Sequence, residues 1–386
     1  MLIFVSLSLV IWLGLIFFHH DFWRCDQLLP EATEGQSNAP DVIAIVPARN
    51  EAETIKACAA SILSQDYPGS LHLIIVNDNS EDETESLARA AIDASDRSGE
   101  VMNGAALKEG WSGKLWALSQ GVAKAGDKAP YLWFSDADIE HGPQLLRKLI
   151  AHAEQGERGL VSLMVRLRAK TFFEKLVVPA FVFFFQKLYP FPAVNNPASR
   201  FGGAAGGCVL IKRQALEDIE GIAAIKDRLI DDCALGAAVK RAGYPIWLGH
   251  GRESHSLRGY DDFSSLSQMV TRTAFAQLGY SNVLLLGTVL GMALIYIVPP
   301  LMVFTGLIAG LEGVALIAAL AWLLMGIAYR PTVRLYDLSA LWAIFLPFTA
   351  VLFEFFTLKS AWAHWRGGHT GWKGRDYASS GDKLEL

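Results

Sequence analysis

The sequence has few of the features that mark disulfide-rich, zinc-binding or nucleic-acid-binding proteins. Its 386 residues include four cysteines, Cys25, Cys58, Cys208 and Cys233, none in CxxC spacing. They predict neither a disulfide framework nor a zinc site, and they fit a reducing compartment. Only 19% of the residues are charged and the net charge is −5, whereas a nucleic-acid-binding face is basic. We therefore expect no nucleic-acid partner.

Apolar residues are abundant instead, and they are concentrated at the two ends of the chain. They make up 52% of it, and the mean hydropathy is positive. Residues 2–18 form an uncharged run just long enough to cross a bilayer, with no basic residues before it and no small-residue cleavage site after it. We expect an uncleaved anchor over residues 1–24 and a polar linker over residues 25–40. Three further candidate spans lie at 283–307, 314–328 and 338–357.

Basic residues give two conflicting indications of membrane topology. A predicted loop over residues 330–334 contains Arg330 and Arg334 and is therefore expected in the cytoplasm, together with the central domain. Four simple crossings of the cell inner (plasma) membrane would then place the tail, residues 363–386, outside. Basic residues on and just before this tail are of the kind normally retained inside. We therefore expect one C-terminal segment of this multi-pass protein to be re-entrant or interfacial.

Between residues 41 and 282, short apolar runs alternate with amphipathic helical patterns. This alternation predicts an α/β fold with a doubly wound, mostly parallel sheet. Ser80 and Glu83 have capping-box spacing for one of the helices. Residues 172–191 are rich in phenylalanine, but their uninterrupted apolar part is too short to cross a bilayer. We expect an interfacial helix or a lid on the acceptor side there.

Carboxylates follow two of the predicted strands. The run from Tyr131 stops at Asp136-Ala137-Asp138, and Asp78 follows an earlier strand. Open α/β sheets bind ligands at the carboxyl ends of their strands. In an extended segment Asp136 and Asp138 would share a face, so both could bind one Mg²⁺ or Mn²⁺ that carries a substrate's phosphates. An aspartate-rich turn without a ligand is the alternative.

Three other motifs have both a functional and a structural interpretation. Lys114 follows Gly113 at a predicted helix start, where it could meet a phosphate, although the spacing is not that of a P-loop ATPase. The glycine run that includes Gly206 permits close approach of a ligand, or forms a tight turn. Asp231 and Asp232 open a helix, where the helix dipole favours carboxylates whatever their function.

Taken in order, these motifs resemble those of the family 2 inverting glycosyltransferases. They are Pro47-Ala48-Arg49-Asn50-Glu51, Val76-Asn77-Asp78-Asn79-Ser80, Gly113-Lys114, Asp136-Ala137-Asp138, the glycine run and Asp231-Asp232. The membrane segments, the glycine run and the tail motif Trp372-Lys373-Gly374-Arg375 look most similar to the hopene-associated glycosyltransferases, which are close in architecture to ceramide glucosyltransferases. The resemblance implies a GT-A-like domain over residues 41–282 and membrane helices over residues 283–362.

The resemblance also implies a role for each matching position. Asp232 would be the catalytic base, and Asp136 and Asp138 would hold the metal and the donor's diphosphate. Glu51 and Asp78 would contact the base and ribose of a uridine-type nucleotide. The implied substrate-binding set is Pro47, Asn50, Glu51, Asp78, Lys114, Asp136, Gly206, Asp231 and Arg272.

Two departures from the family pattern bear on the reaction. Asn77-Asp78 stands where two aspartates are usual. The Gln-x-x-Arg-Trp motif of processive synthases is absent, since Gln268 lies four residues before Arg272 and Thr273 replaces the tryptophan. We therefore expect transfer of one sugar rather than polymerisation.

The expected function is transfer from a nucleotide-sugar, most simply a UDP-sugar, to a hydroxyl of a membrane lipid, with a hopanoid as one candidate. The partners would then be the donor, the lipid acceptor and the bilayer. Two alternatives stay open. One is transfer to a polyprenyl phosphate, and the other is a non-catalytic sugar-lipid carrier built on a degenerate transferase domain.

Overall fold

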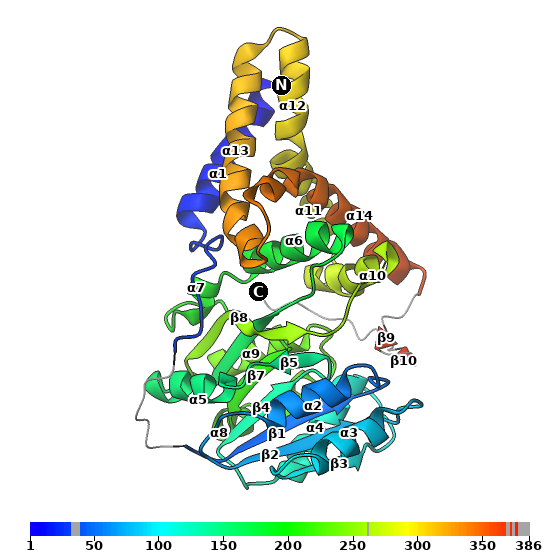
Figure 1. Cartoon of the computed structure of the whole chain (residues 1–386). Helices are drawn as coiled ribbons and strands as arrows, with labels where there is room; N and C mark the ends of the chain where they lie inside the picture. The colour runs from blue at the N-terminus through cyan, green and yellow to red at the C-terminus, as the bar shows by residue number, and fades with distance from the viewer. Residues whose placement is uncertain (32–38, 261, 368–370, 373–374, 377–386) are drawn as a thin grey trace.

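The computed structural model describes residues 1–31, 39–260, 262–367, 371–372 and 375–376. Residues 32–38 of the expected linker, and Lys373 and Gly374 of the tail motif, lie outside the described residues. Figure 1 shows an α/β domain at one end of the molecule and a group of long helices at the other.

An eight-stranded mixed sheet forms the centre of the α/β domain, in the order β3-β2-β1-β4-β7-β6-β8-β5. The strands are β1 Val42–Ala48, β2 Leu71–Asn77, β3 Gly99–Asn103, β4 Tyr131–Ser135, β5 Ile139–His141, β6 Leu160–Arg166, β7 Cys208–Lys212 and β8 Ile246–Ser256. Strands β3, β2, β1 and β4 are mutually parallel, and β6 is parallel to β8. Strand β7 runs antiparallel between β4 and β6, and β5 runs antiparallel to β8. The expected α/β fold is present, with a mixed, mostly parallel sheet.

Helices cover both faces of this sheet because its central strands are apolar on both sides. On β1, Ile43 and Ile45 belong to one buried cluster together with Leu118 of α4. The alternate residue Ala44 belongs to a second cluster with Ile62 of α2. The helices of this domain are α2 Ile55–Leu63, α3 Thr84–Asp93, α4 Gly113–Ala125, α5 Leu145–Gln155, α7 Phe191–Asn195, α8 Arg213–Asp218 and α9 Asp231–Arg241.

The prediction of a capping box formed by Ser80 and Glu83 is wrong. Helix α3 begins at Thr84, its N-cap residue Glu83 makes no side-chain capping bond, and the Thr84 N–H donates to the Asp82 carboxylate at 3.0 Å. The hydroxyl of Ser80 instead accepts a hydrogen bond from the Asn50 backbone N–H at 3.1 Å. Ser80 therefore ties together the loops that follow β1 and β2, and it is not available to the helix.

Helices α6 Phe172–Leu188 and α10 Phe263–Ala274 lie between the sheet and the long helices (Figure 1). Helix α6 begins with a capping box in which Thr171 and Glu174 exchange hydrogen bonds. Its middle is buried, including Val177 and Phe183, while Phe172 at its start is 62% exposed. The segment expected to be an interfacial helix or lid is thus a helix packed mainly inside the protein.

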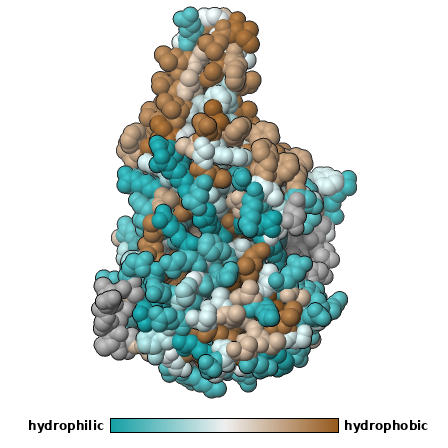
Figure 2. All heavy atoms as spheres, in the orientation of Figure 1, coloured by the Kyte–Doolittle hydropathy of each residue, from teal (hydrophilic) through white to brown (hydrophobic). Residues whose placement is uncertain are grey.

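Among the described residues, three helical stretches are long and apolar enough to cross a membrane: Asn282–Ile308, Glu312–Leu335 and Ala340–Trp365. The first comprises α11 Asn282–Met292, the π-helical turn η3 Ala293–Ile297 and α12 Val298–Ile308. Prolines at 299 and 300 do not interrupt it, because they occupy the first positions of α12, directly after the π-helical turn. The other two stretches contain α13 Glu312–Leu335 and α14 Leu346–Trp365. Apolar side chains cover this end of the molecule in Figure 2, which indicates membrane association.

The prediction of a loop at residues 330–334 is wrong, because these residues form the last turns of α13. Thr332 and Val333 are fully buried, and the Thr332 hydroxyl accepts a hydrogen bond from Gln186 of α6 at 3.3 Å. This packing keeps the segment helical in spite of Pro331. The chain turns only at Asp337, whose φ of 56° lies in the left-handed region.

Helix α1 Leu2–Phe18 packs along α12 and α13 (Figure 1). The fully buried Trp12 donates its indole N–H to the Ile295 carbonyl at 3.0 Å. At 1.5 Å per residue its 17 residues span about 25 Å, slightly less than the roughly 30 Å of a bilayer's hydrocarbon core. The expected N-terminal anchor is therefore a short helix held against the C-terminal ones.

Candidate active site

A small cleft, open to solvent, brings together most of the residues singled out in the sequence. Its lining includes Pro47, Lys114, Asp136, Gly206, Asp231 and Asp232. The cleft lies at the carboxyl edge of the sheet, where β1 and β4 end. Because β7 is antiparallel to β4, with Cys208 opposite Ser135, the glycine run before β7 reaches the same edge. This antiparallel strand explains how positions far apart in the sequence share one cleft.

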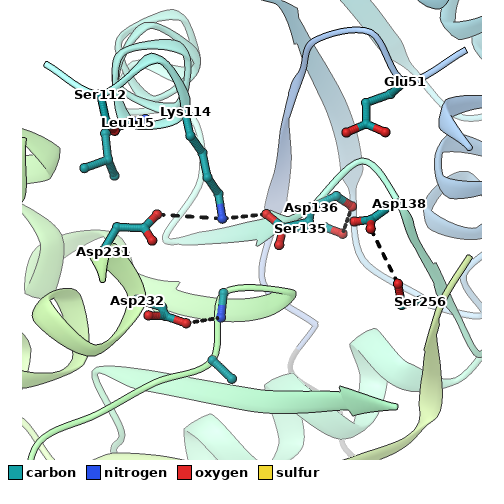
Figure 3. A network of polar contacts seen from close by, with 12 residues as sticks. Glu51, Ser112, Lys114, Leu115, Ser135, Asp136, Asp138, Asp231, Asp232 and Ser256 are labelled. Carbon is teal, nitrogen blue, oxygen red and sulfur yellow. Dashed lines mark hydrogen bonds and ion pairs between the residues drawn. The ribbon is translucent and has the colours of Figure 1, made fainter. Parts of the chain in front are cut away.

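Lys114 is the cation at the centre of the cleft. Ser112 caps helix α4 by accepting the Leu115 N–H at 3.3 Å, which places Lys114 in the first turn. Its ammonium lies 2.7 Å from Asp136 and 3.7 Å from Asp231 (Figure 3). Burial, the largest effect, lowers the pKa of Lys114, but the carboxylates around it raise that pKa above its ordinary value overall. Lys114 therefore stays charged and can meet an anionic substrate group.

Asp232 is held by two backbone N–H groups. Gly206 donates to its Oδ2 at 2.9 Å, and Cys233 donates to its Oδ1 at 2.7 Å. A side chain at position 206 would lie 3.3 Å from the Lys114 nitrogen, so a glycine there permits this close approach. Burial, and then the charge of Asp231, raise the pKa of Asp232 from 3.8 to about 6. A carboxylate with this pKa can take up a proton near neutral pH.

Asp136 and Asp138 are brought together by a turn, which corrects the extended segment expected there. The Ile139 N–H donates to the Asp136 carbonyl at 3.3 Å, and the short strand β5 follows. The reason is that β5 pairs with the end of β8, with Ile139 opposite Ser256. Burial and the neighbouring Asp138 raise the pKa of Asp136, whereas Lys114 lowers it. The two carboxylates are therefore close enough to repel each other.

This pair fits a hard divalent cation. Among the described residues no group of three or more His, Cys, Asp or Glu side chains could hold a metal. Mg²⁺ does not need such a cage, because it usually binds through one or two carboxylates, with water and substrate phosphates completing its shell. A cation at Asp136 and Asp138 would also offset their mutual repulsion. The oxygen donors thus match Mg²⁺ or Mn²⁺ together with a diphosphate.

A second group of the expected residues lies at the neighbouring strand ends, outside the lining of the cleft. Asp78 is fully buried after β2, and its N–H donates to the Ala48 carbonyl at 2.8 Å. Asn50 has a φ of 51°, in the left-handed region, and its side-chain oxygen accepts the Glu81 N–H at 2.9 Å. These contacts fix the chain around Glu51, whose carboxylate lies near Asp138 in Figure 3.

Arg258 belongs to this group, although the sequence did not indicate it. It follows β8, and its guanidinium donates to both carboxylate oxygens of Glu51, at 2.8 and 2.9 Å. Its Nε lies 3.4 Å from Asp138. A lone arginine outside any motif gives no signal in one sequence. Only the pairing of β5 with β8 shows that this loop reaches the site.

Arg272 is the one expected substrate-binding residue that lies apart from these two groups. It is exposed on α10, outside the lining of the cleft. Its charge, like that of Arg258, reaches the Tyr260 hydroxyl, since both arginines lower the pKa of Tyr260. Burial and Asp138 act more strongly in the opposite direction, so the pKa of Tyr260 is raised overall. Arg272 thus lies at the rim of the site, on the side of the long helices.

Comparison with known proteins gives one family match and a set of solved structures with a similar fold. Residues 43–220 match the family model of glycosyl transferase family 2. The chain is also similar to the mannosyltransferase PcManGT from Pyrobaculum calidifontis, solved in complex with GDP-Man and Mn²⁺, with 16% identity and a TM-score of 0.51. That match covers 94% of this chain and 98% of the other. No match was found among curated proteins.

A second solved structure is more distant. Glucosyl-3-phosphoglycerate synthase from Mycobacterium tuberculosis, in complex with Mn²⁺ and UDP-glucose, matches with 21% identity and a TM-score of 0.39, over 62% of this chain and 79% of the other. The family model matches residues 43–220 of the 386, and the similarity to PcManGT shows that the two chains share a fold.

Proposed function

We propose that this protein is a membrane-bound, metal-dependent inverting glycosyltransferase that moves one sugar from a nucleotide-sugar to the hydroxyl of a membrane lipid. The observation that carries the proposal is the position of Asp232. It is a half-buried carboxylate with a raised pKa, in the same cleft as Lys114 and Asp136. A carboxylate that can accept a proton, in one cleft with groups that suit a diphosphate, supports this proposal.

The chemistry follows from these charges. The lipid oxygen attacks the anomeric carbon while Asp232 accepts the hydroxyl proton, and the bond from that carbon to the diphosphate oxygen breaks. A single displacement of this kind inverts the anomeric configuration. Lys114 lies where it can stabilise the negative charge that develops on the leaving group. Mg²⁺ or Mn²⁺, held by Asp136 and Asp138, would supply Lewis-acid stabilisation of the same diphosphate.

The acceptor is proposed to be a lipid because the site faces the long apolar helices. Arg166, at the carboxyl end of β6, forms an ion pair of 2.5 Å with Asp337, directly after α13. On the other side of the site, Ser360 of α14 donates to the Thr271 carbonyl of α10 at 2.6 Å. The carboxyl edge of the sheet thus lies at the base of the candidate membrane spans. A hopanoid acceptor rests on sequence resemblance alone.

One observation favours a second acceptor, a polyprenyl phosphate. Arg258 and Arg272 both lie near Tyr260, between the candidate metal ligands and the long helices. Two guanidinium groups on the membrane side would suit an acceptor phosphate. With this acceptor the nucleophile is already an anion, so a catalytic base would matter less.

The test uses the full chain, purified in detergent or nanodiscs, with Mn²⁺ and a panel of UDP- and GDP-sugars. Lipid extract and a polyprenyl phosphate are offered as separate acceptors, and products are identified by mass spectrometry and by the NMR coupling of the anomeric proton. We expect a metal-dependent product of inverted configuration on a lipid hydroxyl. A protein that binds nucleotide-sugar but neither transfers nor hydrolyses it would instead fit a non-catalytic carrier.

A further inference from the structure

Arg258 links the two groups of the site. Its guanidinium contacts the Glu51 carboxylate at 2.8 and 2.9 Å and lies 3.4 Å from the Asp138 carboxylate. The loop is positioned by the backbone, because the Leu257 N–H donates to the Asp138 carbonyl at 2.7 Å. The exposed fractions of the Glu51 and Asp138 side chains are only 10% and 18%, whereas that of Arg258 is 39%, so the carboxylates are largely withdrawn from solvent and the arginine is within reach of a ligand.

Each of the two candidate metal ligands is therefore already in contact with a fixed cation. Lys114 lies beside Asp136, and Arg258 lies beside Asp138. A divalent cation bound here would be repelled by Lys114 and would have to displace Arg258 from Asp138. A nucleoside diphosphate brings negative charge that attracts these cations, and it offers the displaced arginine a new partner. Metal alone should thus bind weakly, and metal with nucleotide should bind well.

We propose that Arg258 stands in for the divalent cation at Asp138 and for the nucleoside at Glu51 in the donor-free protein, and that the two ligands displace it together. This inference rests on the proposed function, because it takes Glu51 and Asp138 as the nucleoside and metal contacts. Arg258 acts here as a positioning residue. It makes the binding of metal and nucleotide positively cooperative.

The direct test measures binding rather than turnover. Free Mn²⁺ is followed by electron paramagnetic resonance on the full chain in nanodiscs, with and without UDP or GDP. The wild type should bind Mn²⁺ about 5- to 150-fold more tightly when nucleotide is present, the usual range of coupling between two sites. By linkage, Mn²⁺ should tighten nucleotide binding by the same factor, which isothermal titration calorimetry can measure.

Arg258→Gln removes the competing charge. It should bind Mn²⁺ alone at least about five-fold more tightly than the wild type, and its coupling factor should fall by a similar amount. Arg252→Gln is the matched control, since Arg252 is an exposed arginine on β8 and the charge change is the same. Arg258→Lys keeps one positive charge and should keep Mn²⁺ binding weak.

The outcomes separate this inference from the proposed function. A wild type that binds neither Mn²⁺ nor nucleotide contradicts the proposed function itself. If both bind, but Arg258→Gln leaves the Mn²⁺ affinity and the coupling factor within about two-fold of the wild type, only the role of Arg258 is overturned. If Arg258→Lys binds Mn²⁺ as tightly as Arg258→Gln, the positive charge at position 258 does not compete with Mn²⁺, and the proposal is wrong.

Discussion

The ammonium of Lys114 lies 2.7 Å from the carboxylate of Asp136, although one residue opens helix α4 and the other follows strand β4. This ion pair joins the two sides of the cleft. It also sets the charge that Asp232 experiences, because Lys114 lowers the pKa of Asp232 while Asp231 raises it. The leaving-group side and the proton-accepting side of the site are therefore electrostatically coupled.

Lys114→Met should weaken donor binding and raise the pKa of Asp232. Loss of the cation removes a partner for the diphosphate and leaves the carboxylates of the cleft to repel one another. We expect the donor KM to rise and the acid limb of the kcat/KM profile to move to higher pH. Lys124→Met, at the other end of α4, is the control, since Lys124 pairs with Glu100 at the surface. An unchanged acid limb would show that Lys114 does not reach Asp232.

Asp138→Ala should abolish transfer while the protein stays folded. Removal of one of two carboxylates leaves the cation with too few protein ligands, and a bound cation offsets several kcal/mol of developing charge on the diphosphate. We expect at least about a 100-fold loss of kcat/KM and an unchanged melting temperature. Chelation of the wild type with EDTA should have the same effect. Full activity in excess EDTA would contradict the metal assignment.

The sequence predicted the strands of this fold well, because buried strands are apolar runs that end at polar residues. It did not predict that β7 is antiparallel. Its residues Val209 and Ile211 look the same in either direction, and only pairing with β4 and β6 sets their orientation. It also missed β3 and β5, and the three residues of β5 become a strand through pairing with the end of β8. The local sequence pattern therefore predicts whether a segment is a strand better than it predicts which strand it pairs with and in which direction.

The same distinction applies to the site. Asp136, Asp231 and Asp232 stand in recognisable motifs, and the structure brings them into one cleft with Lys114. Arg258 has no motif, because its role arises from the path of the loop after β8. Arg272 was expected to bind substrate, yet helix α10 places it at the rim. Contacts made through loops and helix orientation depend on tertiary structure, which one sequence does not contain.

Asp232 should make the folded protein less stable as the pH rises. Its pKa is about 6 in the folded state and 3.8 as an ordinary aspartate, so between these values the folded state binds more protons than the unfolded state. Stability from this group is therefore highest below about pH 4 and is lost through about pH 6, by at most roughly 3 kcal/mol for this half-buried side chain. Asp232→Asn lacks this titration. The difference in melting temperature, wild type minus variant, should fall between about pH 4.5 and pH 7, and a constant difference would contradict the raised pKa.

Deletion of residues 2–18 should leave the protein in the membrane but less stable. The three longer apolar helices remain, and each inserts far more firmly than a lipid anchor. The lost helix carries Trp12, which is fully buried and bonded to the Ile295 carbonyl. We expect the variant in the carbonate-washed membrane pellet, with a lower melting temperature in detergent. Recovery in the soluble fraction would show that the C-terminal helices do not hold the protein in the membrane.

The last prediction separates the two neighbouring aspartates of α9. Asp232→Asn should reduce kcat by about 10²- to 10⁴-fold, because the lipid hydroxyl loses its proton acceptor, while donor binding is retained. Asp231→Asn should keep much more activity. Because the charge of Asp231 raises the pKa of Asp232, its removal should shift the acid limb of kcat/KM below the value of about 6. Asp93→Asn, an exposed residue at the end of α3, is the control.

The two variants distinguish a chemical role for Asp232 from the ordinary preference for carboxylates in a first helical turn. If Asp232 only stabilised the N-terminus of α9, its replacement would lower stability and leave the rate of the folded enzyme unchanged. Replacement of a catalytic base would lower the rate and remove the acid limb near pH 6. Transfer by Asp232→Asn at a near wild-type rate would contradict this role. A product that keeps the donor's anomeric configuration would also contradict it, because retention through a glycosyl-enzyme needs a nucleophile on the opposite face of the sugar.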